Sequence, residues 1–229
     1  MSQAVVDGRY YEVAGPNSLA DRLMHAARRR IVGKMAELHP FHRMKGRLLD
    51  VGVSDVLTGS DNMLERVYPC PWKITALGLG SGEDFRKEFP QVRYLQGSGL
   101  GPLPFDGRQF LLATSNAVLE HLGSVEAQEQ HLSELLRVAE EVFISAPNRW
   151  FPIEHHTALP FLHWWRPAFE AACRVTGKGA WAREDELLFV TAKSLRRLVE
   201  AVAPGRRYEI GFTGICLGGL SSNLFLSIK

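Results

Sequence analysis

The chain has 229 residues, of which 45% are hydrophobic and 23% charged. These are the values of an ordinary globular protein, and they exclude a disordered, collagen-like or coiled-coil chain. Lysine and arginine number 27 against 25 aspartate and glutamate, and the net charge of +2 gives no reason to expect nucleic acid as a partner.

The N-terminal part of the chain predicts one helix. The first fifteen residues contain no apolar run, which is not the pattern of a secretory signal, so we expect a cytoplasmic protein of bacterial type. Residues 18–38 predict a helix because apolar side chains recur at steps of three and four residues. Asn17 or Ser18 can cap its first turn. We therefore expect a helical segment over residues 1–46, ahead of the main domain.

From residue 47 onward, short apolar runs alternate with helical stretches. Strands are predicted at residues 47–52, 74–79, 92–96, 110–115 and 141–147, and helices at about 62–68, 83–89, 124–138 and 192–203. Such alternation is typical of βαβ units, whose parallel sheet is covered by helices on both faces. Two last strands, 207–214 and 223–229, are separated only by the turn sequence GGLSS, which predicts an antiparallel pair at the sheet edge. We expect an α/β fold over residues 47–229, a doubly wound, mostly parallel sheet of seven strands with the last strand antiparallel.

The segment from about residue 147 to 190 interrupts this alternation. It is too long for a plain connection, and it holds four of the five tryptophans. We therefore predict an inserted lid that covers a ligand. Residues 160–175 are apolar with one basic edge, which predicts a helix packed on this lid. Peripheral contact with a membrane surface is the alternative for that stretch.

The loop after the first strand is the first candidate for ligand binding. In open parallel sheets, ligands bind beyond the carboxyl ends of the strands. Gly52 begins this loop and allows a tight turn with a close approach of backbone amides to a ligand. The loop has neither G-x-G-x-x-G nor G-K-S/T, which speaks against a different nucleotide-binding enzyme. Asn62 can cap the helix that follows, with Glu65 reaching back three residues later.

Five sequence segments follow one another in a recognisable order. They are RLLDVGV, ITALGL, VRYLQGSGLGPLPF, FLLATSNAVLEHLGS and EVFISAPNRWFP. Their order resembles that of the class I S-adenosylmethionine-dependent methyltransferases, from the first glycine motif to the fifth strand. More narrowly, SNAVLEHLGS, PNRWFPIEHHTALPFLHWW and the tail GLSSNLFLSIK resemble a bacterial subgroup thought to act on sugars or lipid-linked glycans.

This resemblance implies S-adenosylmethionine as the cofactor and a small-molecule or glycan acceptor as the partner. It also implies which residues hold each part of the cofactor. Asp50, Gly52, Val53 and Ser54 would hold its amino-acid end, Gly78, Leu79 and Gly80 would lie by the ribose, Gly97 and Ser98 by the adenine, and Ser115 and Asn116 under the sulfonium.

Several positions depart from the superfamily's usual pattern. Ser54 stands where a second glycine is usual, Ser98 where an aspartate is frequent, and Leu111 where the fourth strand often has aspartate. No acidic residue ends the second strand; either Glu83 or Asp84 substitutes for it, or the cofactor site is degraded. A carboxylate–hydroxyl hydrogen bond contributes about 1.5–3 kcal/mol. Two hypotheses follow: O-methylation of a sugar, glycan precursor or small metabolite, or a catalytically degraded fold that serves as a binding or scaffold partner.

A hydroxyl acceptor needs a base, because a neutral alcohol is a weak nucleophile. His121 follows the fourth strand, which in this fold lies near the cofactor's methyl group; a structural role for Glu120 and His121 in the next helix is the alternative. Glu154, His155 and His156 in the lid are further catalytic candidates, with a histidine as base. Their spacing matches no common zinc pattern, and neighbouring residues of a strand point to opposite faces, so we predict no metal site.

Overall fold

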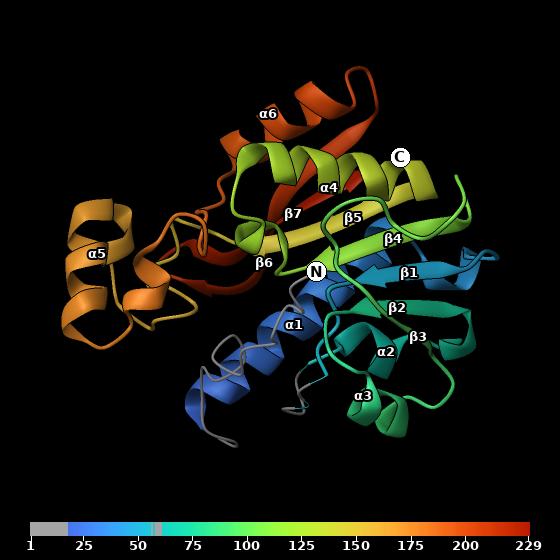
Figure 1. Ribbon diagram of the computed structural model, residues 1–229, viewed down its shortest axis with the longest axis horizontal. Helices are drawn as coiled ribbons and strands as arrows, with labels where there is room; N and C mark the ends of the chain where they lie inside the picture. Colours follow the sequence, from blue (N-terminus) through green and yellow to red (C-terminus); the bar gives the residue numbers. More distant parts are fainter. Residues whose placement is uncertain (1–17, 56, 58–60) are drawn as a thin grey trace.

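The computed structural model describes residues 18–55, 57 and 61–229, and its strands form one seven-stranded sheet (Figure 1). The strands are β1 (Leu48–Val51), β2 (Ile74–Gly78), β3 (Arg93–Gln96), β4 (Phe110–Asn116), β5 (Ala139–Pro147), β6 (Tyr208–Leu217) and β7 (Leu220–Ile228). Their order across the sheet is β3-β2-β1-β4-β5-β7-β6. β7 runs antiparallel to β5 and β6, while the other neighbours pair in parallel. This confirms the predicted fold class.

Helices cover both faces of the sheet (Figure 1). One face carries α4 (Val125–Val138) and α6 (Ala192–Val202), and the other carries α1 (Leu19–Leu38), α2 (Met63–Val67) and α3 (Glu83–Glu88). Every residue of β1 and β2 is buried, as expected of strands that are covered on both sides. Within the described ranges, no helix is both long and apolar enough to cross a membrane.

The sheet has a switch point between β1 and β4. After β1 the chain moves outward to β2 and β3 and then returns to the other side of β1, where Val51 pairs with Ser115 of β4. The loops that follow β1 and β4 therefore leave the sheet side by side. Such a point is where open α/β sheets bind their ligands.

Helix α1 packs against the sheet edge rather than standing apart from it. Ser18 caps its start, since the Ser18 hydroxyl accepts a hydrogen bond from the Asp21 amide at 3.1 Å. Ile31 and Met35 are buried in the hydrophobic cluster that α1 shares with the strands. Thr213 of β6 donates to the backbone carbonyl of Arg30 at 3.3 Å. The helix therefore forms one wall over the carboxyl ends of the strands.

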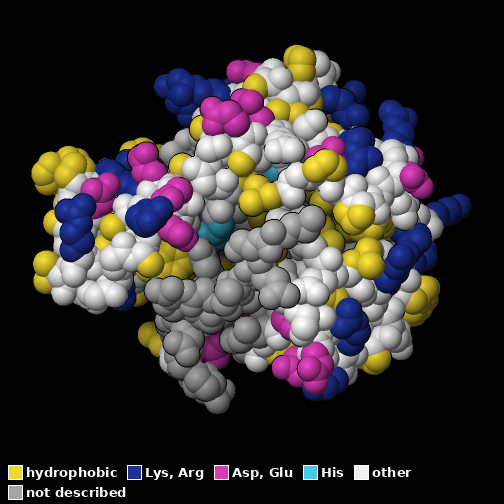
Figure 2. Space-filling view, in the orientation of Figure 1, with side chains coloured by type: hydrophobic (Ala, Val, Ile, Leu, Met, Phe, Trp, Pro, Cys, Tyr) yellow, Lys and Arg dark blue, Asp and Glu magenta, His cyan; other side chains and the backbone are white. Residues whose placement is uncertain are grey.

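Residues 148–191, between β5 and α6, form a lobe at the side of the sheet, which we call the lid (Figure 1). It contains η5 (Leu162–Trp164), α5 (Arg166–Val175) and η6 (Gly179–Ala182). Elsewhere the described residues form the 3-10 turns η2 (Phe41–Arg43), η3 (Pro71–Lys73) and η4 (Leu119–His121). The lobe has a small core of its own, made of Phe169, Cys173, Trp181 and Leu187. Hydrophobic side chains also lie on the surface of the lobe (Figure 2). Trp165 and Val175 are among its exposed hydrophobic residues.

The predicted cap of α2 is wrong. Asn62 has a left-handed backbone, with φ of 53°, and its side chain makes no capping hydrogen bond to the helix. Instead the Asn62 amide pairs with the backbone of Ser54: it accepts from the Ser54 amide at 2.9 Å and donates to the Ser54 carbonyl at 2.8 Å. Glu65 is buried rather than reaching back to the cap. These contacts tie Ser54, at the start of the loop after β1, to Asn62.

Candidate functional site

A cavity of about 470 Å³ lies at the carboxyl ends of β1, β4 and β5. Its walls come from the loops after β1 and β4, from α1, from the β6–β7 hairpin and from the start of the lid. Among the predicted site residues, those that line it are Asp50, Gly52, Val53, Ser54, Asn116, His121, Glu154, His155 and His156. The fold thus brings the predicted catalytic residues of the lid to the loop that follows β1.

Gly52 makes the sharp turn out of β1. Its φ is +95°, a conformation that side chains disfavour, and a Cβ added there would lie 2.1 Å from Cγ2 of Val118. The amides of Gly52 and Val53 both donate to the Leu77 carbonyl, at 2.8 and 3.2 Å. Gly52 itself is exposed toward the cavity. This position therefore requires glycine, and the exposed Gly52 lets a ligand approach the turn closely.

Asp50 lies on the cavity wall and interacts with Glu65 of α2. Both side chains are buried. Burial raises the pKa of Asp50 well above its ordinary value, and the neighbouring Glu65 carboxyl raises it further. Burial also raises the pKa of Glu65 to about 7. The pair therefore retains a proton near neutral pH.

The expected ribose contacts lie away from the cavity. Among the described residues that line it, Gly78, Leu79 and Gly80 at the end of β2 are absent. A carboxylate does lie there, but it is that of Asp55 from the loop after β1. Asp55 accepts hydrogen bonds from the amides of Gly82 and Phe85, at 2.8 and 3.0 Å, at the start of α3.

The expected adenine contacts, Gly97 and Ser98, and also Ser115 are likewise outside the described cavity lining. Ser115 is joined to α4 instead. Nδ1 of His131 donates to the Gly99 carbonyl at 2.8 Å, which makes Nε2 the acceptor of the Ser115 hydroxyl at 3.1 Å. The Ser98 hydroxyl accepts from the Leu100 amide at 3.0 Å, and the Gly97 amide donates to the Gly78 carbonyl at 2.9 Å. Asn116 does face the cavity, and its side-chain oxygen accepts the Ser145 hydroxyl.

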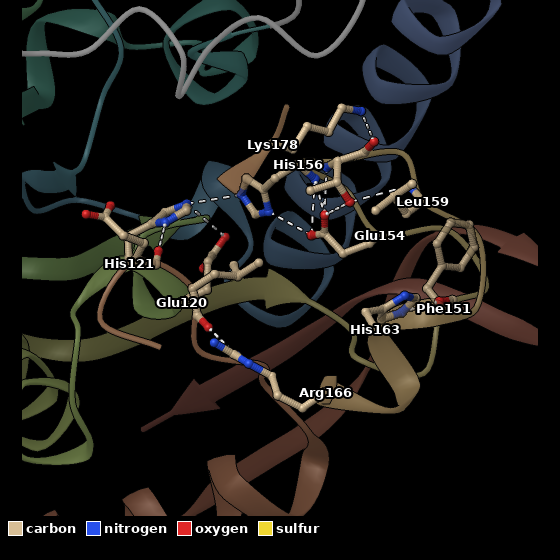
Figure 3. Close-up of polar contacts among 12 residues, drawn as sticks. Glu120, His121, Phe151, Glu154, His156, Leu159, His163, Arg166 and Lys178 are labelled. Carbon is tan, nitrogen blue, oxygen red and sulfur yellow. Dashed lines mark hydrogen bonds and ion pairs between the residues drawn. The ribbon is translucent and has the colours of Figure 1, made fainter. Parts of the chain in front are cut away.

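A line of hydrogen bonds joins the loop after β4 to the lid (Figure 3). Nδ1 of His121 donates to the Glu186 carbonyl at 3.1 Å, and Nε2 of His121 lies 3.1 Å from Nε2 of His156. Nδ1 of His156 lies 2.9 Å from Oε1 of Glu154. Glu154 also accepts from the amide and the hydroxyl of Thr157, both at 2.6 Å. The two imidazoles therefore face each other across the cavity wall, each fixed at its outer nitrogen.

The charges in this line follow from its contacts. Burial and the neighbouring His156 lower the pKa of His121 to about 4. Burial alone would lower the pKa of His156, but the hydrogen bond and charge of Glu154 raise it above its ordinary value. Burial alone would raise the pKa of Glu154, but the hydrogen bonds from His156 and Thr157 hold it at about 2. In this arrangement His156 carries the positive charge and donates to the neutral His121.

Glu120 is the functional candidate that sequence reasoning treated as structural. It is buried, and neither of its carboxylate oxygens has a hydrogen-bond partner among the described residues. Its Oε1 lies 3.9 Å from Nε2 of His121, and burial raises its pKa to about 7. The only sequence signal was its place directly before His121 after the fourth strand.

His155 belongs to the cavity wall but not to this line. Its ring packs against Phe151, with centroids 5.6 Å apart, and its Nε2 has no hydrogen-bond partner in the described part of the chain. Burial and the neighbouring His156 lower its pKa to about 4. His155 and His156 lie in a turn rather than a strand, and both line the cavity, with different contacts.

Solved structures with the same arrangement of strands and helices are S-adenosylmethionine-dependent methyltransferases. Magnesium protoporphyrin IX methyltransferase (ChlM) from Synechocystis PCC 6803, with bound S-adenosylhomocysteine, superposes with a TM-score of 0.60 at 13% identity, over 96% of this chain and 93% of that one. The chain has the class I methyltransferase fold. This fold recurs in a possible histamine N-methyltransferase from Thermotoga maritima (TM-score 0.57, 16% identity, 92% of each chain).

The methyltransferase domain of bacterial CtHen1 is a third relative in fold. Its TM-score is 0.55 at 17% identity, over 89% of this chain and 98% of that one. No protein-family model matches the chain, and no curated protein matches its sequence. At these identities, the methyltransferase likeness is one of fold, and the chemistry has to be argued from the site.

Proposed function

We propose that this chain is an S-adenosylmethionine-dependent methyltransferase that acts on a hydroxyl group of a small molecule, a sugar or a glycan precursor. One observation carries the proposal: a single cavity at the switch point joins the Gly52 loop to the Glu120, His121 and His156 side chains. The similarity in fold to a methyltransferase with bound S-adenosylhomocysteine supports the choice of cofactor.

The cavity residues fit the amino-acid end of this cofactor. The exposed Gly52 lets a ligand approach the turn closely, and Asp50 and Asn116 add polar side chains to the cavity wall. When bound, S-adenosylmethionine supplies a methyl group that is already activated, so the protein has mainly to align the acceptor. The volume of about 470 Å³ falls within the range of small-molecule sites.

The remaining walls suit an acceptor. Leu23, Met24 and Ile31 of α1 provide an apolar wall, whereas Glu120, His121 and His156 provide the polar one. A hydroxyl must lose its proton as it attacks a methyl group. The Glu120 carboxylate, whose pKa burial raises to about 7, lies beside the cavity and can hold that proton. Glu154 orients the imidazole of His156.

A second candidate function is a degraded site that binds a ligand or partner without transferring a methyl group. The carboxylate at the end of β2 favours it, because Asp55 is engaged by the amides of Gly82 and Phe85. A carboxylate with those partners has less capacity to bind ribose hydroxyls. The expected ribose and adenine positions also lie outside the described lining of the cavity.

Calorimetric titration with S-adenosylmethionine and S-adenosylhomocysteine distinguishes the two functions. We expect a Kd on the order of micromolar for both ligands, weakened roughly tenfold by Asn116→Ala, since a lost hydrogen bond of about 1.4 kcal/mol has that effect. A Kd weaker than about 1 mM for both would instead favour the degraded site. If both ligands bind, hydroxylated acceptors are then screened for methylation with labelled cofactor.

A further inference from the structure

We propose that Glu120, His121 and His156 bind a divalent transition-metal ion on the cavity wall. Each side chain offers one ligand atom, and these three atoms all lie within 4.8 Å of one another. The residues come from two distant parts of the sequence, η4 and the lid, which the fold brings together (Figure 3). Metal binding goes beyond methyl transfer and does not require it.

The two imidazoles are held as metal-ligating histidines are held. Ligating histidines usually donate their outer N–H to a carbonyl or carboxylate, which aims the other nitrogen at the metal. Nδ1 of His121 meets the Glu186 carbonyl, and Nδ1 of His156 meets Glu154. The two Nε2 atoms then lie 3.1 Å apart. Two nitrogens bound to one tetrahedral zinc ion lie about 3.3 Å apart, given zinc–nitrogen bonds of about 2.05 Å.

Either a shared proton or a bound metal ion could account for the close approach of these two nitrogens, and the surroundings of Glu120 distinguish the two. A proton shared by His121 and His156 accounts for the 3.1 Å contact but gives Glu120 no hydrogen bond. Both oxygens of Glu120 are buried and lack a hydrogen-bond partner among the described residues. A buried carboxylate without a donor is costly, and a bound cation offsets that cost. Oε1 of Glu120 is 3.9 Å from Nε2 of His121, about 0.6 Å beyond the spacing of two tetrahedral ligands.

The surroundings keep the cluster in place. The Trp181 ring packs against both imidazoles, with its centroid 4.7 Å from that of His156 and 5.9 Å from that of His121. Lys178 donates to the Thr157 carbonyl, and Thr157 in turn donates to Glu154. A site whose ligands are already oriented loses little conformational entropy when it takes up an ion.

The ligand set indicates the class of ion. Two imidazoles and one carboxylate suit zinc and other first-row divalent ions, whereas magnesium and calcium prefer sites made of oxygen atoms. Three protein ligands leave a coordination position open in catalytic zinc sites. All three residues line the cavity, so that position would lie beside it. The sequence-based expectation of no metal considered the lid residues alone, without Glu120 and His121.

Titration of the tag-free full chain with Zn²⁺ alone tests the site, with Co²⁺ absorption as a second readout of coordination. We expect one ion per chain, and we expect the Kd to rise at least roughly tenfold in His156→Gln and in Glu120→Gln. His155→Gln is the matched control, because His155 is the neighbouring lid histidine outside the cluster, and it should bind as the parent does. Circular dichroism melts confirm that each variant is folded.

Two results would overturn the metal site: no stoichiometric Zn²⁺ binding tighter than about 100 μM, or an equal loss of affinity in His155→Gln and His156→Gln. Because no cofactor is added, the outcome is independent of the proposed methyl transfer. Zn²⁺ binding without S-adenosylhomocysteine binding would leave the metal site standing and remove the proposed function. The reverse pattern would retain methyl transfer and remove the metal.

Discussion

Asp50 and Glu65 place two carboxyl groups in one buried region beside the cavity, where water cannot stabilise two negative charges. Burial raises the pKa of Glu65 from 4.5 to about 7. Between those pH values the folded chain binds more protons than the unfolded chain. The free energy of unfolding therefore falls as the pH rises through this window, and the loss is complete above the folded pKa.

Substituting Glu65→Gln should stabilise the protein at alkaline pH. Glutamine keeps the size of the side chain but removes the second charge. The free energy of unfolding of the variant should therefore exceed that of the parent by on the order of 3 kcal/mol near pH 8. The gain should fade as the pH falls toward about 4.5. Urea unfolding at several pH values measures it. Glu88→Gln is the control, because Glu88 is exposed and pairs with Arg66 at the surface. A gain that does not change with pH would contradict the buried-charge explanation.

The residues of the site differ in how far the sequence could predict them. Gly52 was predictable, since a glycine directly after a buried strand indicates a turn that side chains cannot make. Glu120 was not, because a carboxylate before a histidine is equally consistent with a role in the next helix. What distinguishes it is burial without a hydrogen-bond donor, which depends on the lid folding back over η4.

At the scale of elements, the lid depends on one arginine at the start of α5. Arg166 donates to the Leu187 carbonyl at 3.2 Å and to the Ala182 carbonyl at 2.8 Å, and its Nε donates to Glu170 at 3.0 Å. It thereby ties α5 to the returning segment that carries Glu186, whose carbonyl orients His121. Loss of these contacts should loosen the lid without affecting the sheet.

We expect Arg166→Met to lower the local stability of the lid by about 2 kcal/mol, because two backbone carbonyls lose their donor. Hydrogen exchange of the lid amides should accelerate roughly thirtyfold, while exchange in β4 and β5 stays as in the parent. Arg174→Met is the control: it removes an arginine from the same helix that is exposed and pairs only loosely with Glu170, at 3.5 Å. Equal exchange in the two variants would mean that Arg166 does not hold the lid.

Hydrophobic periodicity predicted which elements exist, but pairing decided where they end. β5 was expected from residue 141 and begins at Ala139, because Ala139 pairs with Phe110 of β4 as soon as α4 ends. β6 was expected to end at residue 214 and continues to Leu217, which pairs with Leu220 across the hairpin. Both extensions depend on a partner strand, which no pattern within a single segment encodes.

At the scale of the whole molecule, the cavity exists because α1 lies over the strand ends on one side and the lid closes another. The sequence predicted a helical segment over residues 1–46, distinct from the domain that follows. Whether such a helix is independent depends on what its apolar face contacts. Ile31 and Met35 bury that face in the cluster of the sheet, and His39 joins the end of the helix to β5 and β7.

His39 provides a test of whether α1 unfolds with the sheet. Its side chain is fully buried, with Nδ1 donating to Glu141 and Nε2 accepting the Ser227 hydroxyl at 2.8 Å. His39→Ala removes both hydrogen bonds and leaves a cavity, so the free energy of unfolding should fall by about 2–4 kcal/mol. His42→Ala, an exposed substitution three residues later, should change it by less than about 0.5 kcal/mol.

The cooperativity of unfolding is the decisive part of that measurement. If α1 and the sheet form one unit, tryptophan fluorescence and circular dichroism should report a single coincident urea transition in the parent and in His39→Ala, shifted to lower urea in the variant. An α1 that folds as a separate appendage would instead detach in His39→Ala, giving an early loss of helix signal with the main transition unmoved. The cavity would then lose one wall while the sheet survived, and ligand binding would weaken before global unfolding began.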